Sequence, residues 1–178
     1  SRKIINLPSW DFSRDGKVWS QVAVPHDWAI AGPFDKKWDL QMVAIEQNGE
    51  KEKSEKSGRS GALPWIGEGM YKMNLQLPKG YKRAVLVFDG AMSQPIVKVN
   101  GKEAGRWAYG YNAFRIDITP YVHFGGKKNL VEVHLSNVEE SSRWYPGGGL
   151  YRPVSVELYG NENFSTWDTF VRTLKADK

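Results

Sequence analysis

Histidines and carboxylates are the side chains of this sequence that could do acid–base or metal chemistry. The three histidines, His26, His123 and His134, lie far apart, without the short spacing by which two histidines on one helix share a zinc ion. Hydrolysis by paired carboxylates needs two of them about 5–10 Å apart. The adjacent acids Glu139 and Glu140 would point to opposite faces of a strand, and in a loop both would be solvated. We therefore predict no catalytic residue, no metal and no cofactor in this chain.

Other enzyme motifs are missing as well. The sequence contains no cysteine, which excludes disulfides and thiolate chemistry. It contains neither a G-x-S-x-G nucleophile elbow nor a P-loop. The absence of these motifs favours a binding or scaffolding domain rather than a complete enzyme.

The stretch RWYPGGGLYR, residues 143–152, is unusual because it holds three consecutive glycines. Glycine loses more backbone entropy on folding than any other residue. The presence of Gly147–Gly149 therefore indicates that the backbone adopts a positive φ angle there or that a neighbouring group approaches it closely. A phosphate cradle is the weaker interpretation, because these glycines do not open a helix after a strand.

The elements that must position such a loop are predicted to be strands. Apolar and polar residues alternate with a period of two, as in half-buried strands, and turn residues bound each run. Asn100-Gly101 is the pair preferred in a two-residue hairpin turn. We predict an all-β antiparallel sandwich. The alternating runs are 71–78, 83–91, 95–107, 113–122, 129–137 and 153–160.

Composition limits the partners. The chain has 178 residues, 40% of them hydrophobic, which suits one globular domain or a sandwich with extensions. No apolar run approaches the roughly 18–20 residues that span a bilayer, so we expect no membrane span. The net charge is +5, and the densest group of basic residues, in residues 48–61, is mixed with glutamates. We interpret that segment as a solvated loop and expect no nucleic-acid partner.

Two stretches interrupt the strand pattern. Residues 34–66 form a long loop, and the composition of residues 48–61 within it is typical of a segment without regular structure. Residues 137–150 include the glycine run. The last alternating stretch, 166–178, is interpreted as an exit strand or linker after a domain of residues 1–165.

Five motifs resemble, in the same order, the N-terminal sugar-binding domain of glycoside hydrolase family 2, in its Bacteroides-type β-galactosidase branch. The resemblance implies a jelly-roll, galactose-binding-like sandwich that precedes an immunoglobulin-like domain and a TIM barrel with the two catalytic glutamates. The chain is then a fragment that is inactive by itself. The motifs are VPHDWAIAGPFD (24–35), GALPWIGEGMYKMNLQLP (61–78), VFDGAMSQPIVKVNGKEAG (87–105), GYNAFRIDITPYV (110–122) and SSRWYPGGGLYRPVSVEL (141–158).

The resemblance also suggests substrate-binding residues. Loops of this domain reach the mouth of the barrel in the family, and one carries an acid where this chain has Arg143. Arg143 could donate to sugar hydroxyls, and Trp144 or Tyr145 could stack on a ring. Alternatively, the two aromatics pack under the loop and Arg143 pairs with Glu139. Asp35 could accept hydrogen bonds from galactose hydroxyls.

His26 and Asp27, in contrast, are expected to fix the turn after a strand. The expected function is a non-catalytic sugar-binding domain that helps to shape the substrate pocket of a β-galactosidase, in the periplasm or secreted. Its expected partners are a terminal galactoside-type sugar and the following domains of the same polypeptide. The alternative is a free-standing carbohydrate-binding module, which would bind sugar through an exposed aromatic platform.

Overall fold

The computed structural model of the chain describes residues 2–32, 34, 43–47, 50–54, 65, 67–137, 147–162 and 172. The sequence-based candidates Asp35, Arg143, Trp144 and Tyr145 lie outside these residues, and so do Glu139 and Glu140.

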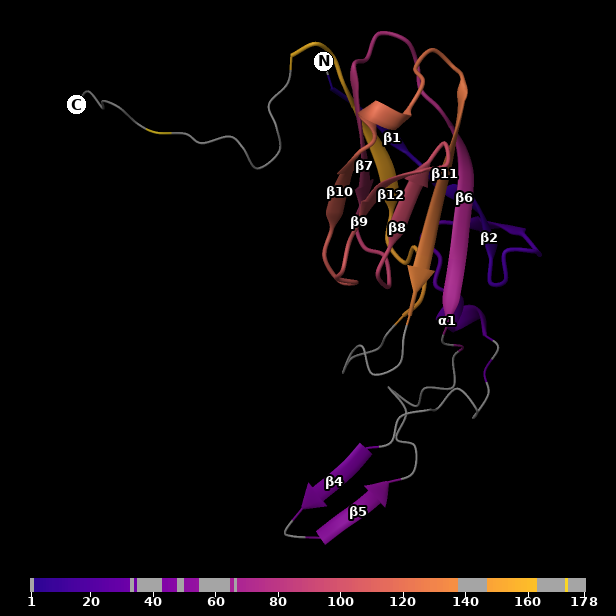
Figure 1. The fold of residues 1–178 in the computed structure, drawn as a ribbon, viewed down its shortest axis with the longest axis vertical. Coiled ribbons are helices and arrows are strands. Elements are labelled where there is room, and N and C mark those ends of the chain that lie inside the picture. The colour runs from indigo at the N-terminus through magenta and orange to yellow at the C-terminus, as the bar shows by residue number, and fades with distance from the viewer. Residues whose placement is uncertain are drawn as a thin grey trace.

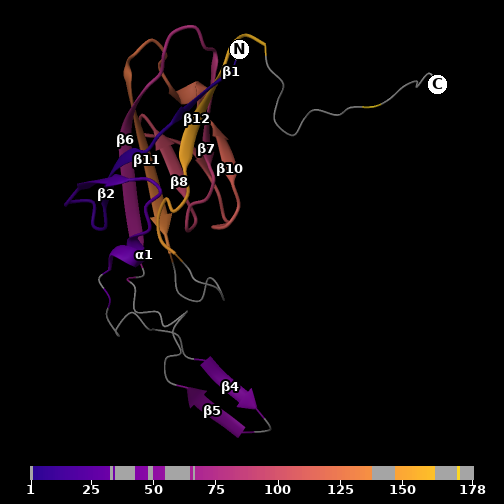
Figure 2. The same cartoon turned by 180° about the vertical axis from the view of Figure 1, so that it is seen from behind.

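Two antiparallel sheets lie face to face, which confirms the all-β sandwich (Figures 1 and 2). The six-stranded sheet consists, in spatial order, of β3 (Ser20–Ala23), β2 (Ser9–Ser13), β6 (Glu68–Gln76), β11 (Lys128–Ser136), β8 (Ile96–Val99) and β9 (Lys102–Arg106). The four-stranded sheet consists of β1 (Arg2–Asn6), β12 (Val154–Tyr159), β7 (Arg83–Phe88) and β10 (Phe114–Asp117). A short 3-10 turn, η2 (Thr119–Tyr121), follows β10.

The core lies between the sheets, where alternate residues of each strand point inward. In β11, Val131, Val133 and Leu135 are buried, while Glu132 and His134 face outward. The more continuously apolar β7 buries alternate residues in the core and has further buried positions on its outer side. The period-two pattern therefore predicted which side chains enter the core.

The predicted hairpin joins β8 to β9. Asn100 and Gly101 have φ angles of 50° and 79°, as the two-residue turn requires. The Asn100 side chain also accepts from the Leu130 N–H at 2.9 Å and donates to the Tyr121 carbonyl at 2.8 Å. This asparagine therefore fixes both the turn and its neighbours.

Two elements differ from the sequence-based expectation. The short helix α1 (Trp28–Ala31) lies where no helix was predicted. A separate hairpin of β4 (Val43–Gln47) and β5 (Glu50–Ser54) lies in the segment expected to lack regular structure. The prediction for this segment relied on its composition and overlooked a local signal for a hairpin. Asn48-Gly49, between these strands, is the same preferred turn pair as Asn100-Gly101. No helix within the described parts of the chain is long and apolar enough to cross a membrane.

Candidate functional site at the loop end of the sandwich

The loops at one end of the sandwich form the candidate site. β7, β9 and β11 run toward this end, and β6, β8, β10 and β12 start from it. We call it the loop end and define it by residues 24–32, 89–95, 107–113 and 147–153. It is the lower end of the sandwich in Figure 1, marked by α1.

The glycine run packs directly against the aromatic core at this end. A Cβ atom at Gly148 would lie 2.1 Å from Trp28 Nε1, and one at Gly149 would lie 2.3 Å from Tyr71 Oη. Gly149 also has a φ angle of 109°, which favours glycine. The close approach of a neighbouring group thus explains Gly148. Close approach and a positive φ angle together explain Gly149.

Asp27 joins the glycine run to α1. Its Oδ1 accepts from the Ala29 N–H at 2.9 Å, which caps the helix, and from the Gly148 N–H at 3.0 Å. The Trp28 N–H in turn donates to the Gly148 carbonyl at 2.9 Å. Gly149 exchanges two backbone hydrogen bonds of 3.0 Å with Met92. Asp27 therefore fixes local structure, as the sequence suggested.

His26 and Tyr71 form a polar pair beneath the glycine run. His26 Nδ1 lies 2.6 Å from Tyr71 Oη. Burial lowers the pKa of His26, and the nearby Arg14 cation lowers it further. The negative charge of Asp27 opposes this effect only in part. Burial also raises the pKa of the Tyr71 hydroxyl. Near neutral pH the pair is therefore a hydrogen bond between an uncharged imidazole and an uncharged phenol, and it holds structure together.

Arg14 holds both ends of the segment that contains Asp35. Its guanidinium donates to the carbonyl of Gly32, just before that segment, and lies 5.0 Å from the ring centre of Trp65, near the segment's end. The Trp65 ring packs edge-on against Trp28 at 5.5 Å. The segment thus starts and ends at the loop end.

The segment that contains Arg143, Trp144 and Tyr145 is held in the same way. Asn137 Nδ2 donates to the Gly147 carbonyl at 2.9 Å, across the two ends of that segment. The Asn137 N–H donates to the Gly67 carbonyl at 3.0 Å. The structure does not describe the candidate side chains themselves, so their roles stay predictions.

Sequence reasoning missed the residues that hold these two segments. Arg14 and Asn137 belong to none of the motifs, and Trp28 was not singled out within its motif. The partners of these three residues lie up to 120 positions away in the chain. The one local signal was PHDW, in which an aspartate before a short apolar run is typical of a helix N-cap.

Apolar side chains are exposed at the loop end. Ile30 is 70% exposed, Phe34 60% and Tyr109 55%. Exposed apolar side chains at one end of a domain are available for contact with another protein unit.

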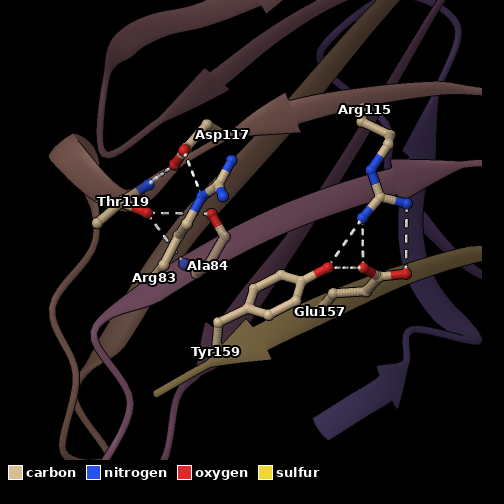
Figure 3. Close-up of polar contacts among 7 residues, drawn as sticks. All are labelled: Arg83, Ala84, Arg115, Asp117, Thr119, Glu157 and Tyr159. Carbon is tan, nitrogen blue, oxygen red and sulfur yellow. Dashed lines mark hydrogen bonds and ion pairs between the residues drawn. The ribbon is translucent and has the colours of Figure 1, made fainter. Parts of the chain in front are cut away.

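One buried carboxylate was a further candidate for chemistry. Glu157 lies on the outer side of the four-stranded sheet and binds Arg115 and Tyr159, as Figure 3 shows. It also binds Arg2 of β1. Burial opposes its ionisation, but the hydrogen bonds from Arg115, Tyr159 and Arg2 outweigh that effect and lower the pKa to about 2. A carboxyl group that is always ionised cannot act as a general acid near neutral pH. Glu157 therefore anchors β1, through Arg2, to the sheet.

The second polar group in Figure 3 is also structural. Arg83 Nε donates to Asp117 Oδ2 at 2.9 Å, and the Thr119 N–H donates to Asp117 Oδ1 at 3.0 Å. The Thr119 hydroxyl accepts from the Ala84 N–H at 3.0 Å, so η2 is tied to β7. Within the described residues, no group of three or more potential ligands could hold a metal ion.

Known proteins share this fold and sequence. No family model matches the chain. The β-galactosidase BoGH2A of Bacteroides ovatus is 32% identical over 163 residues, which are 90% of this chain and 17% of that protein. The crystal structure of a glycosyl hydrolase family 2 member from Bacteroides cellulosilyticus covers 97% of this chain, with a TM-score of 0.69 and 29% identity. This chain belongs to glycoside hydrolase family 2.

The similarity also extends to another activity within the family. The Bacteroides uniformis β-glucuronidase structure covers 90% of the family 2 chain at 25% identity, with a TM-score of 0.65. The family 2 chain spans 23% of the B. cellulosilyticus protein and 18% of the β-glucuronidase. It matches an N-terminal domain of these larger glycosidases.

Proposed function

We propose that this chain is a non-catalytic sugar-binding domain of a β-galactosidase, and that its loop end helps to shape the substrate pocket of a TIM-barrel domain on the same polypeptide. The observation that carries the proposal is the common origin of two segments. The segment with Asp35 and the segment with Arg143 both leave and rejoin the sandwich at the loop end, held by Arg14 and Asn137.

Chain length keeps the two candidates close to this end. Asp35 follows Gly32 by three residues, which reach at most roughly 10 Å. Arg143 precedes Gly147 by four residues, which reach at most roughly 14 Å. We call Asp35, Arg143, Trp144 and Tyr145 together the rim. Its carboxylate and its guanidinium supply an acceptor and donors for neighbouring sugar hydroxyls. Trp144 and Tyr145 supply faces for the sugar ring.

The exposed apolar residues support a neighbouring domain at the same end. Ile30 in α1, Phe34 shortly after it and Tyr109 in the loop after β9 expose apolar surface. The curated relatives are several times longer than this chain, so the family supplies further domains that could cover it. Contact with a barrel would place the rim beside the catalytic carboxylates.

The experiment measures kcat/KM for a chromogenic β-galactoside in the complete enzyme carrying Asp35→Ala. We expect a decrease of about ten- to a thousandfold, equivalent to about 1.4–4 kcal/mol of transition-state binding. The control is Glu162→Ala, which removes an exposed acid three residues after the end of β12. It should leave kcat/KM unchanged. Wild-type kinetics for folded Asp35→Ala enzyme would contradict the assignment of Asp35.

A further inference from the structure

A hollow of about 480 Å³ lies on the outer side of the six-stranded sheet. Trp19 forms an aromatic wall and the strands β6, β11 and β8 form the floor. The lining includes Trp19, Met70, Ile96, Lys98, Glu132 and His134.

A second hollow of about 390 Å³ adjoins the first. Ile96 lines both of them. Gln94, Arg106 and Trp107 contribute to the second hollow, so it also has an indole wall beside groups that form hydrogen bonds. Together the two hollows have a tryptophan toward each end and polar side chains between them.

The first tryptophan is held in place. Trp19 Nε1 donates to the Gly16 carbonyl at 3.3 Å, and Lys72 Nζ lies 3.9 Å from the ring centre. Asp15 Oδ1 closes the loop that carries Trp19 by accepting from the N–H groups of Lys17 and Val18, at 2.8 and 2.9 Å. This wall therefore exists before any ligand arrives, which reduces the entropy lost on binding.

The second tryptophan continues a ring stack that starts in the core. Phe88 and Phe114 stack with ring centres 4.7 Å apart, and Trp107 stacks on Phe114 at 5.6 Å and 11°. The Trp107 N–H donates to the Pro95 carbonyl at 3.1 Å. Trp107 is nevertheless 40% exposed, so part of a rigid indole is available to a ligand.

The floor between the walls carries alternating charges. In the strand register, Lys72 lies opposite Glu132, and Glu132 lies opposite Lys98. The same row continues to Asp11 on β2 and Glu103 on β9. His134 Nε2 lies 3.2 Å from Glu68 Oε2. Such a floor offers donors and acceptors at short intervals, as a row of sugar hydroxyls requires.

We propose that the two hollows form one groove that binds an oligosaccharide chain. Indole faces match the apolar faces of pyranose rings, and Lys98, Glu132 and Arg106 match the hydroxyls between them. The strands from β6 to β9 span three interstrand steps, or roughly 14 Å, which is too long for one sugar ring. This groove goes beyond the proposed function, because it holds a polymer on the outer side of the six-stranded sheet through residues other than Asp35, Arg143, Trp144 and Tyr145.

The test probes an array of mono- to hexasaccharides, both neutral and uronic-acid-containing, with this chain, and then measures affinities by titration calorimetry. We expect binding that strengthens at least tenfold from the monosaccharide to the tetrasaccharide of the best series. Trp19→Ala and Trp107→Ala should each weaken it at least tenfold. Glu132→Gln should weaken it as well, and it preserves side-chain size if a tryptophan variant fails to fold.

Leu130→Ala is the matched control, because Leu130 is exposed on the same sheet but lines neither hollow. It should bind like the wild type. The proposal is overturned if no array member binds, if affinity does not depend on chain length, or if folded groove variants bind like the wild type. Binding lost in Asp35→Ala but kept in the groove variants would place the sugar at the rim, and would leave the proposed function standing without the groove.

Discussion

At the residue scale, Gly148 and Gly149 show why a loop can need glycine for packing. The indole of Trp28 and the hydroxyl of Tyr71 occupy the space that side chains at these positions would fill. The backbone of the run can therefore pair with residues 26–28 and with Met92. The adjoining segment with Arg143 then starts from a fixed point.

Gly148→Ala should lower the free energy of unfolding by about 2 kcal/mol or more, because the new methyl group overlaps the Trp28 ring. Gly80→Ala is the control: its φ angle is 91°, but nothing lies within 4 Å of the new Cβ, so only the backbone cost of about 1 kcal/mol applies. Chemical denaturation of both variants measures the difference. Equal losses would show that the glycine run does not serve close packing.

His26 gives the chain a dependence of stability on pH. Its pKa is lowered in the folded chain from the ordinary value of 6.5, so the unfolded chain takes up a proton first as the pH falls. The free energy of unfolding should be highest above pH 7 and decrease between pH 7 and 5. Asp15 and Glu157, with pKa values of about 2, act only at lower pH. His26→Gln should flatten the curve between pH 7 and 5, and an unchanged slope would exclude His26 as its origin.

At the element scale, strands follow from local pattern and the short helix does not. The period-two runs predicted β6 to β12 because each strand buries one face against the core. Helix α1 has four residues, too few for a helical period, and it forms because Asp27 caps it and Trp28 is buried under the glycine run. The cap is local, but the contacts of Asp27 and Trp28 with Gly148 join residues more than a hundred positions apart in the chain. For the same reason the sequence suggested the candidate segments but not Arg14 and Asn137, which hold them.

Asp27→Ala should destabilise the chain by about 1–2 kcal/mol, because it removes both the cap of α1 and the acceptor for the Gly148 N–H. Asp27→Asn retains an acceptor oxygen and should lose less than half of that amount. Thermal and chemical denaturation check the order of the two variants. An Asn variant as unstable as the Ala variant would mean that the charge of Asp27, rather than these hydrogen bonds, is what matters.

At the scale of the whole molecule, the proposed function separates the residues that stabilise the sandwich from those that would recognise the substrate. The polar network around Glu157 anchors β1 on one sheet, and the aromatic cluster around Trp28 anchors the loop end. The two candidate segments begin and end at residues of that end, from which, in the proposed function, they would contact a substrate held elsewhere on the polypeptide. Changes in their side chains should therefore alter catalysis in the complete enzyme without altering the stability of the sandwich.

The most direct measurement compares Arg143→Ala in two settings, with Lys128→Ala, at the start of β11, as the control for loss of a positive charge. In the complete enzyme, Arg143→Ala should lower kcat/KM for a β-galactoside about ten- to a thousandfold. In this chain the same substitution should scarcely change the melting temperature, because an exposed rim contributes little folding energy. A chain that melts several degrees lower, together with a folded complete enzyme that keeps wild-type kinetics, would contradict the account and show that Arg143 serves the fold.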